Sequence, residues 1–69
     1  MSSIEFIGAE IERLRFQISR QQNDILTLRR SGRSTELAEE LLRRMRASIS
    51  GLCRKRDWLQ QESRIAAIN

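Results

Sequence analysis

The sequence predicts an all-α protein, an antiparallel two-helix hairpin of the coiled-coil type, and three observations lead to this prediction. The 69 residues include no proline, no tyrosine and only three glycines, and 32% of them are charged, which suits long helices. Branched apolar residues recur at alternating spacings of three and four. A single break interrupts this pattern. We therefore expect one domain over residues 1–69, with helices at 3–30 and 35–66 and a turn at 31–34.

The first helix is expected to begin at Ser3. Ser2 and Glu5 have the spacing of a capping box, and Met1 and Phe6 are placed as the accompanying hydrophobic staple. Its apolar seam consists of Ile4, Ile7, Ile11, Leu14, Ile18, Ile25 and Leu28, with Gln21 at the one polar position. A seam this narrow requires a partner helix, and a polar seam position commonly fixes the register of the pair.

The turn follows from the residues between the two periodic segments. Gly32 suits a left-handed C-terminal cap, and Arg29 and Arg30 carry positive charge where the helix end is negative. Ser34 has a side chain that can cap the start of the next helix. A connection this short makes the two helices antiparallel neighbours.

The second helix is expected to face the first along a matching seam. This seam consists of Ala38, Leu42, Met45, Ile49, Leu52, Arg56 and Leu59, with Leu41 and Cys53 widening it on the flanks. Facing residues then have numbers that sum to about 63. The small residues from Ala47 to Gly51 either let another helix approach closely or mark a weak point of the helix.

The hairpin is expected to associate with further chains. Two helices leave one side of each seam open, and a chain of 69 residues buries little of its surface. We expect a homodimer that forms a four-helix bundle, or another homo-oligomer, together with a protein partner.

Two groups of apolar residues are candidate partner-binding sites. Phe16 is placed opposite the seam among arginines, which is typical of an interaction hot spot, although a single exposed apolar residue is also ordinary. Trp58, Ile65 and Ile68 lie off the seam, where the second helix outruns the first. This end either meets another chain, most simply a second copy, or frays.

The positive charge is the basis for an alternative function. The net charge is +4, and all 13 basic residues except Lys55 are arginines. The candidate basic surface consists of Arg29, Arg30, Arg33, Arg43, Arg44 and Arg46. Arginine binds phosphate and carboxylate alike. These residues therefore either contact nucleic acid independently of its sequence or form salt bridges with the acidic residues among them.

Several function classes are not expected. There is no histidine, one cysteine and no glycine-rich phosphate loop, so we expect no enzyme activity, no cofactor, no metal site and no small-molecule substrate. No apolar run approaches the length needed to span a bilayer, and the apolar stripes are already committed to each other, so we expect no membrane association. A protein-interaction or adaptor module of the cytoplasm is the function we predict.

Overall fold

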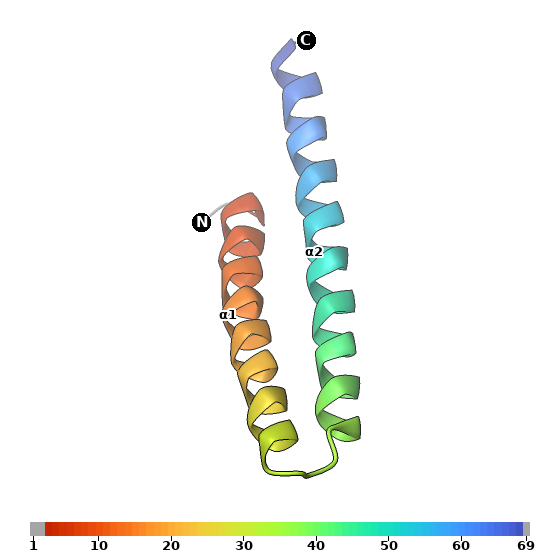
Figure 1. Ribbon diagram of the computed structural model, residues 1–69. Helices are drawn as coiled ribbons and strands as arrows, with labels where there is room; N and C mark the ends of the chain where they lie inside the picture. The colour runs from red at the N-terminus through yellow and green to blue at the C-terminus, as the bar shows by residue number, and fades with distance from the viewer. Residues whose placement is uncertain (1–2, 69) are drawn as a thin grey trace.

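A computed structural model shows two α-helices packed against each other as a hairpin, which confirms the all-α prediction (Figure 1). Helix α1 spans Ser3–Arg30 and α2 spans Glu36–Ile68. The structure describes the backbone of residues 3–68 and the side chains of residues 3–65. Met1 and Ser2, which the predicted staple and capping box require, lie outside this range. Helix α2 begins one residue later than expected and continues two residues further.

The helices meet along the predicted seam. Every seam position of α1 is buried or half-buried, and Ile7, Ile11 and Ile25 form the buried core, with Ile11 only 1% exposed. The seam positions of α2 are all half-buried. The prediction that Leu41 widens the seam is wrong. Leu41 is 45% exposed, because it lies one residue before Leu42 and so about 100° away around the helix.

A glycine cap ends α1. Gly32 has a φ of 71°, a left-handed conformation that glycine adopts without steric cost. The Gly32 N–H donates to the Arg29 carbonyl at 3.1 Å, and the Arg33 N–H donates to the Leu28 carbonyl at 2.9 Å. These two bonds are those of a Schellman motif. The predicted C-terminal cap is therefore confirmed.

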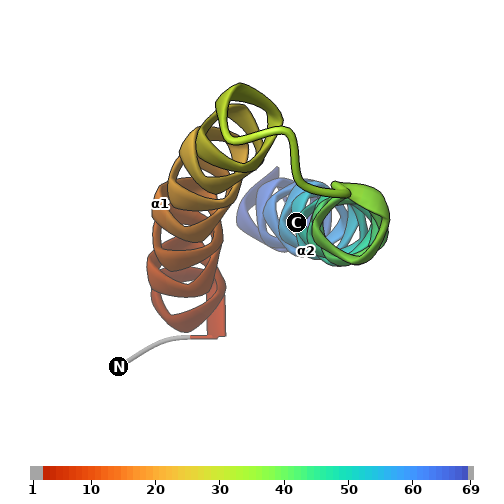
Figure 2. The same cartoon turned by 60° about the horizontal axis from the view of Figure 1, so that its bottom comes forward.

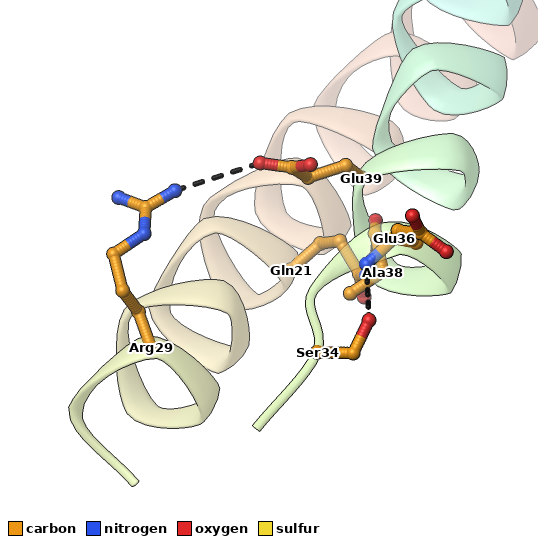
Figure 3. Close-up of polar contacts among 6 residues, drawn as sticks. All are labelled: Gln21, Arg29, Ser34, Glu36, Ala38 and Glu39. Atoms are coloured by element: carbon orange, nitrogen blue, oxygen red, sulfur yellow. Dashed lines mark hydrogen bonds and ion pairs between the residues drawn. The ribbon is translucent and has the colours of Figure 1, made fainter. Parts of the chain in front are cut away.

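The start of α2 is capped by the residues just before it. The Ser34 hydroxyl accepts a hydrogen bond from the Glu36 N–H at 3.4 Å (Figure 3). The Thr35 carbonyl accepts the bond from the Glu39 N–H at 2.8 Å. The two caps together confine the connection to residues 31–35, so that the chain reverses direction within one short turn.

Two polar contacts join the helices close to the turn. The Gln21 side chain donates from Nε2 to the Ala38 carbonyl at 2.9 Å, and Arg29 pairs with Glu39 at 3.5 Å (Figure 3). The residue numbers of these pairs sum to 59 and 68, values that bracket the expected 63. Gln21 is thus satisfied within the seam, because its amide finds a partner in the facing backbone.

Helix α2 extends beyond the N-terminal end of α1. It contains 33 residues against 28 in α1, and Figure 1 shows its last turns without a facing helix. Figure 2 looks nearly along α2 and shows α1 beside it. The hairpin measures 59 by 18 by 12 Å between Cα atoms. It is therefore a single thin layer, in which each helix has only one neighbour.

Candidate interaction surfaces

Phe16 lies on the outer side of α1 and is 65% exposed. Among the neighbouring arginines, Arg13 pairs with Glu10 at 2.6 Å and Arg15 pairs with Glu12 at 3.2 Å. Two of the charges around the aromatic ring are therefore already neutralised by acids one turn earlier. The result is an exposed aromatic side chain in a charged but locally balanced setting.

The Glu10 and Arg13 pair is also where ionisation is perturbed. The hydrogen bond from the Arg13 guanidinium holds the pKa of the Glu10 carboxyl below its ordinary value, and the positive charge acts in the same direction. The pair is exposed to solvent, so its contribution to stability is small.

Trp58 and Ile65 are exposed on α2, by 60% and 54% respectively. They line a shallow hollow of about 290 Å³ together with Gln61 and Glu62. One heptad separates the two apolar side chains, which places them on the same side of the helix. The side chain of Ile68, which was predicted to belong with them, lies outside the described residues.

The basic residues divide into two groups. Arg29 pairs with Glu39, while Arg43 and Arg44 both pair with Glu40. Among the described side chains of residues 3–65, Arg30, Arg33 and Arg46 make no ion pair, and all three are exposed. Three of the six arginines of the predicted basic surface therefore form salt bridges, as the alternative interpretation predicted. The other three present charge that no described acidic side chain neutralises.

Two grooves run between the helices on opposite sides of the seam. One has a volume of about 460 Å³ and is lined by Gln22, Asn23, Ile25, Leu26, Arg29, Glu39, Leu42 and Arg46. The other has a volume of about 270 Å³ and is lined by Gln17, Arg20, Gln21, Asp24 and Met45. Apart from seam residues, the larger groove is lined mostly by residues that follow seam positions in the sequence, and the smaller groove by residues that precede them.

The sequence-based prediction missed several exposed apolar residues. Leu37 is 87% exposed at the start of α2, and Leu26 lies exposed in the larger groove. Phe6, which the predicted staple pairs with Met1, is also exposed. Leu37 precedes a seam position by one residue, as Leu41 and Trp58 do, and this offset is the sequence signal that could have revealed it.

Among the described residues, no three histidine, cysteine or acidic side chains gather where they could hold a metal ion. Neither α1 nor α2, over the same residues, contains a stretch apolar and long enough to cross a bilayer. Cys53 is a free, half-buried thiol.

No protein-family model matches this sequence, and neither a curated protein nor a solved structure matches it. What the surfaces of this chain do is therefore inferred from their geometry alone.

Proposed function

We propose that this chain is a small, non-enzymatic module that binds other proteins, as an adaptor or regulator, through the outward apolar residues of its hairpin. The observation that carries the proposal is an imbalance in burial. Among the described residues, seven large apolar side chains are exposed and only three hydrophobic residues are buried. Exposed apolar surface on such a scale is typical of protein-binding sites.

The thinness of the hairpin explains this imbalance. No described side chain of α2 is fully buried, and its one neighbouring helix leaves its other sides open. A four-helix bundle made from two hairpins would cover a second side of each helix. Self-assembly into such a dimer is therefore part of the proposal, as is the cytoplasmic location expected from the sequence.

Affinity capture with matched variants tests the proposed function. The tagged protein is recovered from its native lysate after nuclease treatment, and bound proteins are identified by mass spectrometry. We expect the variant Phe16→Ser with Trp58→Ala to lose proteins that the natural chain retains, while Arg30→Gln with Arg33→Gln keeps them. Circular dichroism must show the same helix content in all three. Identical capture by all three, or no bound protein, would contradict the proposal.

A second candidate function is nucleic-acid binding that does not depend on base sequence. The observation in its favour is the exposed, unpaired charge of Arg30 and Arg33 at the turn and of Arg46 on α2. Binding of this kind releases counterions and weakens steeply with salt. Fluorescence anisotropy with a labelled 20-base-pair duplex, measured at several salt concentrations, separates the two functions. If the chain binds nucleic acid, the variant Arg30→Gln with Arg33→Gln should lose binding.

A further inference from the structure

Most of the exposed apolar residues lie on one side of the hairpin. On α2 they belong to a second stripe with alternating spacings of four and three, which we call the outer stripe. It consists of Leu37, Leu41, Arg44, Ser48, Gly51, Lys55, Trp58, Glu62 and Ile65, all of them exposed. Each position precedes a position of the seam repeat by one residue. The outer stripe therefore runs about 100° around the helix from α1, as the contact face for another helix in a bundle would.

The two grooves show where this stripe lies relative to α1. The larger groove takes Glu39 and Arg46 from α2 and Leu26 from α1, which are positions one residue after the seam on both helices. Positions one residue before the seam therefore share the opposite side, where the smaller groove lies. Phe6 is such a position on α1, so it shares this side with the outer stripe and lies level with Trp58. Five of the seven exposed large apolar residues thus lie on a single side.

The outer stripe has the pattern of a surface that pairs with itself. Large apolar residues stand at both of its ends, small residues stand in the middle, and Gly51 lies at the midpoint. If two copies pack antiparallel about Gly51, Leu37 lies against the partner's Ile65, and Arg44 lies against the partner's Trp58. An arginine over an indole ring is a favourable pairing. In-register parallel packing would instead place each charged residue against the identical residue of the other chain.

Within one hairpin, no atom packed around residue 51 requires a glycine there. A Cβ atom added there would meet nothing within 4 Å, and its backbone is helical. Glycine destabilises a helix interior relative to alanine, so this position carries a cost without a local reason. A close crossing of two helices at this residue supplies the reason, because glycine lets the backbones approach.

Helix α1 shows a matching charge pattern at the level of Gly51 along the hairpin. Glu10 and Arg13 lie there one residue before seam positions, on the same side as the outer stripe, and they form an ion pair within the chain. A twofold axis through the level of Gly51 brings Glu10 of one copy near Arg13 of the other, and the reverse. The charges of α1 are therefore complementary under the same symmetry that pairs the two outer stripes.

We infer that a second copy of this chain covers this side of the hairpin, with the two α2 helices antiparallel and crossing at Gly51. The inference rests on the proposed function and specifies the geometry of its dimer. The hairpin extends 59 by 18 Å between Cα atoms, with α2 alone reaching its far end, and this outline is of the same order as the about 800 Å² that a standard interface takes from each partner.

Sedimentation equilibrium with two glutamate variants tests the inference. Gly51→Glu brings two like charges together at the crossing point, and we expect it to raise the dimer dissociation constant about tenfold or more. Ser50→Glu is the matched control, because Ser50 is exposed and lies about 100° around the helix from Gly51. Equal dissociation constants for the two variants, or a natural chain that is monomeric at 100 µM, would overturn the inference.

Disulfide cross-linking tests the direction of the helices. In a Cys53→Ala background, Gly51→Cys should form a cross-linked dimer in a glutathione buffer, because the two Cα atoms at the crossing would lie within the 4.4–6.8 Å that a disulfide needs. Leu37→Cys should not, since its two copies would be about 42 Å apart. Cross-linking at both positions, or only at residue 37, would overturn the antiparallel arrangement. The capture experiment would then still decide the proposed function separately.

Discussion

The two helices carry seams of the same alternating spacing, yet only α1 buries any of its described side chains completely. The facing helix covers Ile7, Ile11 and Ile25 of the α1 seam, whereas Phe6, Phe16 and Leu26 of the same helix stay exposed. The apolar residues of α2 are divided between its seam and the outer stripe, and one partner helix cannot cover both. The difference indicates that the buried core is built around the α1 seam, while α2 keeps the larger share of the exposed apolar side chains, namely Leu37, Leu41, Trp58 and Ile65.

The largest expected effect comes from the centre of the α1 seam. Ile11→Ala removes a side chain that is 1% exposed, and the lost burial and the cavity together should cost about 2–5 kcal/mol of unfolding free energy. Leu52→Ala, near the same level on α2, should cost less because Leu52 is only half-buried. Urea denaturation at low protein concentration measures both. Equal losses would break the comparison between the helices.

A smaller effect is expected at the turn, which sets how the two seams face each other. Gly32→Ala places a side chain at a φ of 71°, and the left-handed conformation should cost about 1–2 kcal/mol. Gly8→Ala is the control, because Gly8 is helical and a Cβ atom there meets nothing within 4 Å. This control should raise the melting temperature in circular dichroism. A turn variant as stable as the natural chain would contradict the role of the cap.

The smallest effect concerns the exposed ion pair of α1. Because the pKa of Glu10 is lowered in the folded chain, its contribution to stability is present above the ordinary carboxyl pKa and is lost as pH falls through the lowered value. Arg13→Gln should return the pKa of Glu10 toward its ordinary value in an NMR pH titration. Arg15→Gln, which disturbs the neighbouring pair with Glu12, is the control. An unchanged pKa in the Arg13 variant would exclude the ion pair as the cause.

The seam and the turn could be predicted from the sequence because each depends on local rules. The period of Ile4 to Leu28 determines which side of α1 is covered, and Gly32 is the residue that a left-handed cap favours. The outer stripe does not stand out in the same way. Its apolar residues are separated by Arg44, Lys55 and Glu62, so the stripe becomes evident only once the seam has fixed what lies beside it.

The sequence also predicted some of the exposed apolar residues and missed others. Phe16, Trp58 and Ile65 were expected to lie off the seam, and all three are exposed. Leu37 was overlooked because a leucine among acids at a helix start resembles ordinary surface. Which acidic residue each arginine pairs with depends on how far its side chain reaches within a helical turn. The spacing in the sequence suggests these pairs but does not decide them.

The short turn at residues 31–35 also determines the order in which the hairpin forms. Contacts near it close small loops, whereas bringing Phe6 beside Trp58 closes a loop of about fifty residues at a higher entropic cost. The helices should therefore zip from the turn toward the open end and unzip in the reverse order. Amide hydrogen exchange should be slower near Ile25 than near Ser3. A second copy bound across Trp58 would act on the end that opens first, so assembly would slow the opening of the whole hairpin.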